Sequence, residues 1–228
     1  MVRETLKAAV IITAAGTSTR MGVGTKKEFL TLNNASVLLL SVKPFIESKL
    51  FSNYIIVLPK QEIEKGREIL APIMKKVRIN FVSGGSSRQE SVYNGLIALE
   101  EETPDIVLIH DGARPWINKS VIERVFASTS LKGASIPIVA SVNAMKSIDS
   151  SGTIITNLKR EFTVAAQTPQ GFNYSQILSS HKKAHLDNST YIDDTEIYSK
   201  YAGKVTTVPG DIANRKITYQ SDMLTNPT

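Results

Sequence analysis

The stretch that decides the fold is AAVIIT at residues 8–13, which runs directly into AAG at residues 14–16. An apolar run with β-branched residues, broken by small residues, is typical of a buried parallel strand that ends in a loop. In open α/β sheets, ligands bind at this end of the strands. Small residues let backbone N–H groups approach an anion, and Arg20 and Lys27 place positive charge around the same space. The stretch therefore indicates a cradle for a triphosphate.

This loop carries neither of the two common phosphate-binding motifs. No Gly-Lys-Ser/Thr closes the turn, and the Gly-x-Gly-x-x-Gly pattern of dinucleotide-binding proteins is missing as well. A strand followed by a glycine-containing turn and basic residues also occurs in many α/β proteins for purely structural reasons. Support for phosphate binding must therefore come from the rest of the chain.

The same order of strand, turn and helix recurs further along. A strand expected at Val77–Val82 ends in a Ser-Gly-Gly-Ser-Ser turn, and Ser87 begins a capping-box signal for a helix from Arg88 to about Glu101. A third strand, Asp105–His110, leads into Asp-Gly-Ala-Arg-Pro. Strands and helices that alternate in this way predict a parallel sheet whose strand ends share one ligand face.

The remaining segments are assigned by their periodicity and by turn and cap residues. Helices are expected at 36–50, at 61–76 with an interruption near Pro72, at 119–128 after Asn118, at 174–185, and at 194–201 after Asp193. Strands are expected at 54–58, at 133–142 with a break at Pro137, and at 204–208. Residues 167–172 are too polar for a core strand, and the last expected segment is 215–218.

The section between residues 143 and 166 has a different rhythm. Residues 145–148 and 153–158 flank an Asp-Ser-Ser-Gly turn, which predicts a two-stranded hairpin. Because a lone hairpin is marginally stable in water, it should pack on something, and a second subunit is the natural candidate. The fold class expected is therefore α/β, with a Rossmann-like, mostly parallel sheet, helices on both faces and a protruding β-hairpin arm. Residues 1–228 are expected to form one domain.

Composition narrows the class of protein. The 228 residues are 42% hydrophobic, enough for a packed core, and the net charge is +6. The basic residues are spread along the chain in runs no longer than a pair, which argues against nucleic acid as the partner. Cysteine is absent, and His110, His181 and His185 do not have zinc-site spacing. No signal peptide or long apolar span is seen, so we expect a cytoplasmic protein without a membrane partner.

Five motifs, in order along nearly the whole chain, together point to one family. They are Ala14-Ala15-Gly16-x-x-x-Arg20-Met21-Gly22 with Lys27; Gly84-Gly85 to Arg88 and Ser91; His110-Asp111-x-Ala113-Arg114-Pro115; Thr168-Pro169-Gln170 with Asp194; and Asn214-x-Lys216-Ile217-Thr218. With these motifs the chain resembles the 2-C-methyl-D-erythritol 4-phosphate cytidylyltransferase family of the non-mevalonate isoprenoid pathway. The resemblance also implies the α/β fold predicted above.

The resemblance implies a reaction and its catalytic residues. The phosphate of methylerythritol phosphate would attack the α-phosphate of CTP, giving 4-diphosphocytidyl-2-C-methyl-D-erythritol and pyrophosphate, with Mg²⁺. Such a transfer needs alignment and positive charge rather than a tuned acid or base. Arg20 and Lys27 look like the catalytic residues that hold the triphosphate and stabilise the five-coordinate phosphorus.

The resemblance also implies the nucleotide pocket. The residues that look like CTP contacts are Ala14, Ala15, Gly16, Gly85, Ser86, Ser91, Asp111 and Gly112. Ser91 is also an ordinary first-turn helix serine. Asp111 looks like the Mg²⁺ ligand, since Mg²⁺ is commonly bound by one carboxylate together with phosphate oxygens and water. A purely structural pair between Asp111 and Arg114 is the competing interpretation.

For the acceptor phosphate, the resemblance points to Arg114, Arg160, Thr168 and Lys216. In the family the arm of one subunit completes the neighbour's site, so Arg160 implies a homodimer formed through the arm. From the residues alone, a solvated arginine in the charge cluster Lys159-Arg160-Glu161 is the favoured interpretation of Arg160, and Lys216 is an ordinary strand lysine.

Four positions depart from the family's usual residues. Ser18 replaces a glycine and Glu28 a glutamine, while Ala144 and Asp193 replace threonines on the acceptor side. Cytidylyl transfer is less affected by these changes than the identity of the acceptor. Another polyol phosphate such as ribitol 5-phosphate is therefore an alternative acceptor, and a non-catalytic nucleotide-binding protein is the alternative from a different class.

Overall fold

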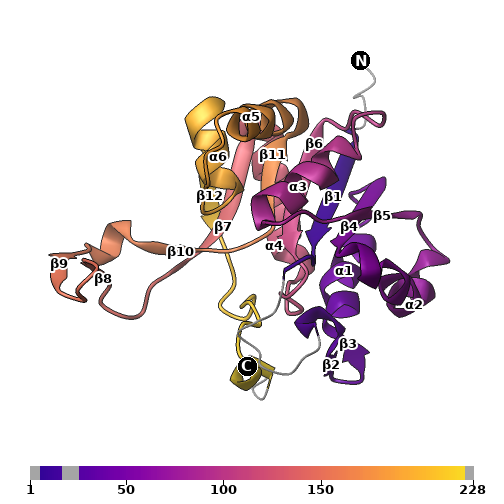
Figure 1. Cartoon of the computed structure of the whole chain (residues 1–228), viewed down its shortest axis with the longest axis horizontal. Coiled ribbons are helices and arrows are strands. Elements are labelled where there is room, and N and C mark those ends of the chain that lie inside the picture. The colour runs from indigo at the N-terminus through magenta and orange to yellow at the C-terminus, as the bar shows by residue number, and fades with distance from the viewer. Residues whose placement is uncertain (1–5, 17–25, 224–228) are drawn as a thin grey trace.

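The computed structural model describes residues 6–16 and 26–223 of the chain. Its centre is an eight-stranded sheet in the order β10-β7-β11-β6-β1-β4-β5, with β12 paired to β7 (Figure 1). The strands of this sheet are β1 (Ala8–Thr13), β4 (Asn53–Leu58), β5 (Ile79–Ser83), β6 (Ile106–Asp111), β7 (Ala134–Ala140), β10 (Val164–Ala166), β11 (Gln170–Asn173) and β12 (Thr206–Pro209). Strands β5, β4, β1 and β6 run parallel, whereas β11 is antiparallel to both of its neighbours.

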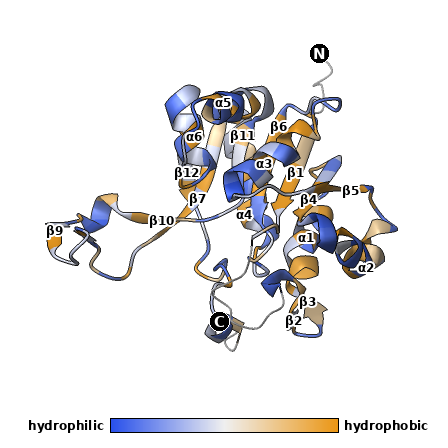
Figure 2. Ribbon diagram, in the orientation of Figure 1, coloured by the Kyte–Doolittle hydropathy of each residue, from blue (hydrophilic) through white to orange (hydrophobic). Residues whose placement is uncertain are grey.

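Helices cover both faces of the sheet because the central strands are apolar on both sides. In β1, Val10 and Ile12 face one core and Ile11 faces the other. The first core is closed by α1 (Val37–Ser48), α2 (Ile63–Met74) and α4 (Lys119–Lys132), and the second by α3 (Arg88–Ile97), α5 (Tyr174–Leu186) and α6 (Asp194–Tyr201). Figure 2 shows this division as apolar strands between helices of mixed hydropathy. The predicted α/β class with helices on both faces is confirmed.

Short elements complete the described chain. The small strands are β2 (Thr31–Leu32), β3 (Ala35–Ser36), β8 (Lys146–Ile148) and β9 (Ile154–Asn157), and the 3₁₀ turns are η2 (Lys27–Phe29), η3 (Lys60–Glu62), η4 (Arg160–Phe162) and η5 (Gln220–Met223). No helix in residues 6–16 and 26–223 is both long and apolar enough to cross a membrane.

The predicted caps are present, with one difference. Asn118 and Asp193 accept hydrogen bonds from the first turns of α4 and α6, and Ser87 accepts one from the Glu90 N–H of α3. The Glu90 side chain, however, binds the N–H and hydroxyl of Ser86 instead of the N–H of Ser87. The Glu90 half of the capping box therefore contacts the residue before the helix-capping Ser87. Helix α3 ends at Ile97, before the predicted Glu101.

The prediction for residues 167–172 was wrong, because β11 lies inside the sheet between β6 and β7. Its polar residues have partners from distant parts of the chain. Gln170 donates to the Asp193 carboxylate at 2.9 Å, and Asn214 donates to the Thr168 carbonyl at 2.8 Å. Gly171 packs where a Cβ would lie 2.2 Å from the Thr129 side chain of α4. Polarity did not exclude a core strand here, since buried polar groups cost little once they are hydrogen-bonded.

The two proline interruptions and the last expected segment also differ from prediction. Helix α2 continues through Pro72 and ends two residues later, at Met74, so the proline lies in its last turn and does not interrupt it. Strand β7 continues through Pro137, whose carbonyl still accepts a hydrogen bond from Gln167 at 2.9 Å. Residues 215–218 form no strand; the Ile217 N–H donates to the Ala113 carbonyl at 2.8 Å, and Lys216 lines the pocket described below.

The predicted hairpin is present as β8 and β9, and it projects away from the body of the molecule (Figure 1). Several of its large apolar side chains are exposed, including Ile148, Ile154, Ile155 and Phe162. Within this chain, β10 returns the arm to the main sheet by pairing with β7.

Candidate active site

A pocket of about 450 Å³ opens at the carboxyl ends of β1, β5 and β6. It is lined by Thr13, Ala15, Gly16, Lys27, Glu28, Gly85, Ser86, Ser87, Arg88, Ser91, Asp111, Ala113, Lys216 and Thr218. Three turns that are far apart in sequence therefore meet at one edge of the sheet, where parallel sheets bind ligands.

The loop after β1 is built for close packing against the turn after β5. Ala14 is buried and donates its N–H to the Val57 carbonyl at 2.8 Å, so the strand is extended by one residue. At Gly84, an added Cβ would lie 2.3 Å from the Ala15 Cβ. The two turns touch through small residues, which leaves the backbone of residues 15–16 facing the pocket.

The turn after β5 is held in shape by its own serines. The Ser91 hydroxyl donates to the Ser87 carbonyl at 2.8 Å and accepts the Gly85 N–H at 3.1 Å. The Glu90 carboxylate accepts the Ser86 N–H and hydroxyl, both at 2.7 Å. Ser91 therefore shapes the wall of the pocket as well as lining it.

Two consecutive lysines lie beside the loop after β1, and the second of them, Lys27, lines the pocket. Lys27 is buried in η2, and its Nζ donates to the Ile217 carbonyl at 2.8 Å. Lys26 donates to the Gly16 carbonyl at 2.6 Å, and burial lowers its pKa. Arg20, which the sequence paired with Lys27, lies outside the described residues.

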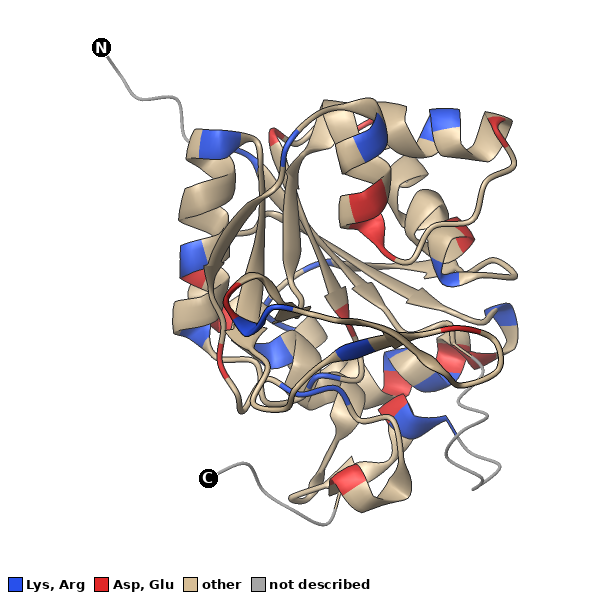
Figure 3. Cartoon of the chain, turned by 90° about the vertical axis from the view of Figure 1, so that its left-hand side faces the viewer, with Lys and Arg blue, Asp and Glu red and all other residues tan. Residues whose placement is uncertain are grey.

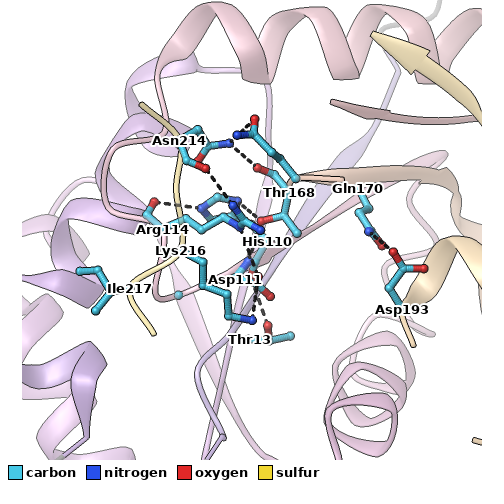
Figure 4. A network of polar contacts seen from close by, with 12 residues as sticks. Thr13, His110, Asp111, Arg114, Thr168, Gln170, Asp193, Asn214, Lys216 and Ile217 are labelled. Atoms are coloured by element: carbon cyan, nitrogen blue, oxygen red, sulfur yellow. Dashed lines mark hydrogen bonds and ion pairs between the residues drawn. The ribbon is translucent and has the colours of Figure 1, made fainter. Parts of the chain in front are cut away.

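Asp111, at the end of β6, is the electrostatic centre of the pocket (Figure 4). Its Oδ2 contacts Lys216 Nζ at 3.0 Å and Arg114 Nε at 3.3 Å, and its Oδ1 lies 3.6 Å from Arg88 Nε. Burial disfavours the charged carboxyl, but Lys216, Arg88 and Arg114 outweigh it and hold the pKa of Asp111 well below its ordinary value. Asp111 is therefore ionised and surrounded by cations from three different parts of the chain.

Asp111 is held from behind by a chain of hydrogen bonds through Thr168 and His110 (Figure 4). The Asp111 N–H donates to the Thr168 hydroxyl at 3.1 Å, which lies 2.9 Å from His110 Nδ1, and His110 Nε2 lies 3.4 Å from the Arg114 carbonyl. A carbonyl only accepts, so Nε2 carries the proton and Nδ1 accepts from Thr168. Burial lowers the pKa of His110 to about 3 and keeps this ring neutral.

We expect His110 to remain neutral at every pH above about 4. Because its folded pKa of about 3 lies below the unfolded value of about 6.5, the unfolded chain binds the extra proton, and the free energy of unfolding should fall by up to ~1.4 kcal/mol per pH unit below pH 6.5. Nitrogen-15 NMR of the histidine rings between pH 5 and 8 should show a non-titrating Nε2–H tautomer. A ring that titrates near pH 6.5 would contradict this assignment.

A second ion-pair chain, which the sequence did not predict, reaches Asp111 through Arg88. Arg88 Nη1 lies 2.8 Å from Asp194 Oδ2, and Asp194 Oδ1 lies 3.1 Å from His181 Nε2. Burial opposes both charges, but Asp194 and Asp111 raise the pKa of Arg88, while Arg88 and His181 lower the pKa of Asp194. Arg88 belongs to the motif that begins at Gly84-Gly85, but its position after the helix-capping Ser87 does not predict the contact with Asp194.

The predicted site residues fall into three groups. Those lining the pocket are Ala15, Gly16, Lys27, Gly85, Ser86, Ser91, Asp111 and Lys216. Those that support it without lining it are Ala14, Gly112, Arg114 and Thr168. Arg160 lies in η4, between β9 and β10 of the arm, and is not among the described residues that line the pocket.

Two of the residues that differ from the family's usual ones, Asp193 and Ala144, do not line the pocket. Asp193 Oδ1 accepts the N–H groups of Thr195 and Glu196, and its Oδ2 accepts from Gln170. Its charge is therefore used to cap α6. Ala144 is exposed on the segment that leads into the arm and does not line the pocket. Ser18 lies outside the described residues.

The polar side chains of the pocket suit an anionic ligand better than a metal ion held by protein ligands alone. Among the described residues, no three His, Cys, Asp or Glu side chains gather to form a metal site. Over the side of the molecule shown in Figure 3, Lys and Arg are interspersed with Asp and Glu instead of forming one continuous basic face. Three cationic residues, Lys27, Arg88 and Lys216, line the pocket itself.

Comparison with known proteins identifies the family. Residues 8–227 match the family model described as 2-C-methyl-D-erythritol 4-phosphate cytidylyltransferase. Proteins of that name from Clostridium botulinum and Clostridium novyi are each 38% identical to this chain. The first alignment covers 95% of this chain and 96% of the relative, and the second covers 95% and 94%.

Solved structures agree in fold. The 4-diphosphocytidyl-2C-methyl-D-erythritol synthase of Anaerococcus prevotii superposes with a TM-score of 0.84 at 26% identity, covering 97% of this chain and 96% of that one. The 2-C-methyl-D-erythritol 4-phosphate cytidylyltransferase of Thermus thermophilus gives 0.77 at 25% identity, covering 96% of each chain.

Proposed function

The chain belongs to the 2-C-methyl-D-erythritol 4-phosphate cytidylyltransferase family, and from this we propose that the pocket around Lys27 and Asp111 is where its reaction occurs. The protein is a nucleotidyltransferase that joins CTP and 2-C-methyl-D-erythritol 4-phosphate to give 4-diphosphocytidyl-2-C-methyl-D-erythritol and pyrophosphate, in isoprenoid precursor biosynthesis. The observation that carries the location is the meeting of the loop after β1, Lys27, Asp111 and Lys216 in one cavity.

The geometry suits a transfer that needs little acid or base chemistry. An acceptor phosphate oxygen attacks the α-phosphorus of CTP, forming one P–O bond as the bond to pyrophosphate breaks. The attacking oxygen is already charged, so the protein must align the two groups and offset negative charge. We assign the stabilising charge to Lys27 and Arg20, and the contact with the acceptor phosphate to Lys216, whose side chain is 36% exposed at the pocket.

The two walls of the pocket divide the substrates. We assign the nucleoside to the wall formed by Ala15, Gly16, Gly85 and Ser86. Arg114 and Thr168 are assigned a positioning role, because they contact Asp111 and His110 and do not line the cavity. This differs from the direct phosphate contact that the resemblance implied for both residues.

We propose Mg²⁺ as the metal and Asp111 as its protein ligand. One carboxylate fits Mg²⁺ when phosphate oxygens and water supply the other ligands. The long 3.6 Å contact to Arg88 leaves Asp111 Oδ1 better placed for this than Oδ2, which contacts Lys216 and Arg114. When bound, the metal would offset charge on the phosphates of CTP.

Turnover of a defined panel of acceptors tests the proposed function. Pyrophosphate release from CTP should require 2-C-methyl-D-erythritol 4-phosphate and should be far slower with ribitol 5-phosphate or erythritol 4-phosphate. Equal or faster release with ribitol 5-phosphate would overturn the assignment of the acceptor. Failure to release pyrophosphate with any acceptor, although CTP binds, would favour a nucleotide-binding protein.

Since CTP is an intracellular metabolite, we propose a cytoplasmic location.

We also propose that the enzyme is a homodimer in which Arg160 of one subunit reaches the acceptor side of the partner's pocket. The projection of the arm and its exposed apolar residues support this, because Ile154, Ile155 and Phe162 have no cover within the described chain. Such a contact would bring Arg160 close to a pocket that it does not reach in its own chain.

Complementation between two inactive variants tests the shared site. Lys27→Met and Arg160→Ala should each lose most activity, whereas refolding an equal mixture should restore about a quarter of the wild-type activity, because half of the sites in the heterodimers are intact. Light scattering should show a dimer for each variant. No recovery in mixed dimers, or full activity from a monomer, would contradict a site shared between subunits.

A further inference from the structure

Glu28 is a buried carboxylate in the wall of the pocket, and the proposed reaction gives it no role. It follows Lys27 in η2, and it is 3% exposed. Its Oε2 accepts no hydrogen bond within the described part of the chain, and its ion pair to Lys26 Nζ is long at 3.9 Å. A buried carboxylate oxygen without a hydrogen bond is costly and therefore needs an explanation.

The charge of Glu28 depends on cations that also serve the phosphates. Burial raises the pKa of Glu28, and Lys26, Lys27 and Lys216 oppose that rise. Lys27 and Lys216 are the two described lysines that line the pocket. The same positive charges must therefore be shared between the Glu28 carboxylate and any phosphate that enters.

Three other charged groups near η2 do not line the pocket. They are Lys65 of α2, which sits over the Phe29 ring at 4.9 Å; Glu62 of η3, which faces Lys26; and Asp222 of η5, which faces Lys27. Glu62 and Asp222 do not line the pocket, whereas Glu28 and Asp111 do. Asp111 is already paired with Arg88, Arg114 and Lys216, which leaves Glu28 as the carboxylate in the lining without a close cation. An incoming triphosphate would therefore meet the carboxylate of Glu28 directly.

We propose that Glu28 takes up one proton from solvent when the phosphates of CTP enter the pocket, and that the neutral carboxyl donates a hydrogen bond to a phosphate oxygen. This inference rests on the proposed function, which places the triphosphate beside Lys27. Two like charges close together in a buried site cannot both persist, and protonation of one removes the repulsion. Protonation also turns an acceptor-only group into a donor, which supplies the partner that Oε2 lacks.

Calorimetric titration with CTP and Mg²⁺, without acceptor, tests the proton uptake. Repeating the titration in buffers of different ionisation enthalpy gives the protons bound per CTP, and work between pH 7.5 and 8.5 avoids the phosphate's own titration near pH ~6. Wild type should take up more protons than Glu28→Gln, by up to one. Its CTP affinity should fall by up to about tenfold per pH unit, whereas Glu28→Gln should bind with little pH dependence.

Glu62→Gln is the matched control, because it removes an acidic residue that faces Lys26 outside the pocket. It should keep the wild-type proton uptake. Infrared difference spectra of wild type on adding CTP should show a new protonated-carboxyl band that Glu28→Gln lacks, and this readout does not depend on the variant's affinity. Equal proton numbers in wild type and Glu28→Gln, without such a band, would overturn the inference. If CTP did not bind to wild type at all, the proposed function itself would fail.

Discussion

Replacing Lys27 with methionine is expected to lower kcat for CTP-dependent pyrophosphate release by about a thousandfold, with a much smaller change in CTP affinity. A group that interacts more strongly with the transition state than with the bound substrate affects kcat before it affects binding. Lys27 fits this description, since its Nζ is already oriented by the Ile217 carbonyl at 2.8 Å in a buried position. Methionine keeps an unbranched apolar stem but removes the ammonium group, and with it both the charge and the hydrogen bond to the Ile217 carbonyl.

The control for this experiment is Lys65→Met. Lys65 lies over the ring of Phe29, in the same η2 turn as Lys27, so its loss removes one positive charge from the neighbourhood but none from the pocket. Its kcat should stay within about twofold of wild type. Single-turnover rates and equilibrium CTP binding should be measured for both variants. A Lys27→Met enzyme that loses CTP affinity as much as turnover would assign Lys27 to ground-state binding.

Much of this architecture could be predicted from local patterns. Strand β1 and its small-residue loop are encoded by consecutive residues, and the caps at Ser87, Asn118 and Asp193 depend on neighbours within four positions. Such signals do not require knowledge of the tertiary structure. The pocket followed from them, because parallel strands bring their carboxyl ends to the same edge.

The main features that were missed depend on partners distant in sequence. Strand β11 looks too polar until Gln170 meets Asp193, and Thr168 looks like a substrate ligand until its hydroxyl is placed between His110 and the Asp111 N–H. A motif shows that a residue belongs to a site, but it does not distinguish contact with the substrate from support of another residue. That distinction required the positions of both partners.

Replacing Asp111 with asparagine is expected to lower both activity and stability. Asp111 gathers Lys216, Arg114 and Arg88, so the neutral amide leaves three cations without their shared partner. Removing one member of a buried ion pair costs about 3–5 kcal/mol; since Lys216 and Arg88 are partly exposed, we expect a loss of about 2–3 kcal/mol in the free energy of unfolding. The displaced cations should lower kcat/KM by about a hundredfold or more.

The pH dependence of the free energy of unfolding distinguishes the effect of the Asp111 charge from the effect of its shape. Its pKa is lower in the folded state, so its contribution to stability is complete above the unfolded pKa of about 3.9 and is lost only as the pH falls below that value. The gap in unfolding free energy between wild type and Asp111→Asn, measured with urea, should therefore be constant from pH 7 to 5 and should narrow below about pH 4. Asp105→Asn, at the opposite end of β6, should leave kcat/KM unchanged, because Asp105 lies outside the pocket and binds the Lys7 N–H. A gap that narrows already between pH 7 and 5 would mean that Asp111 is not the ionised centre of the network, and Lys216 would then need another counter-charge.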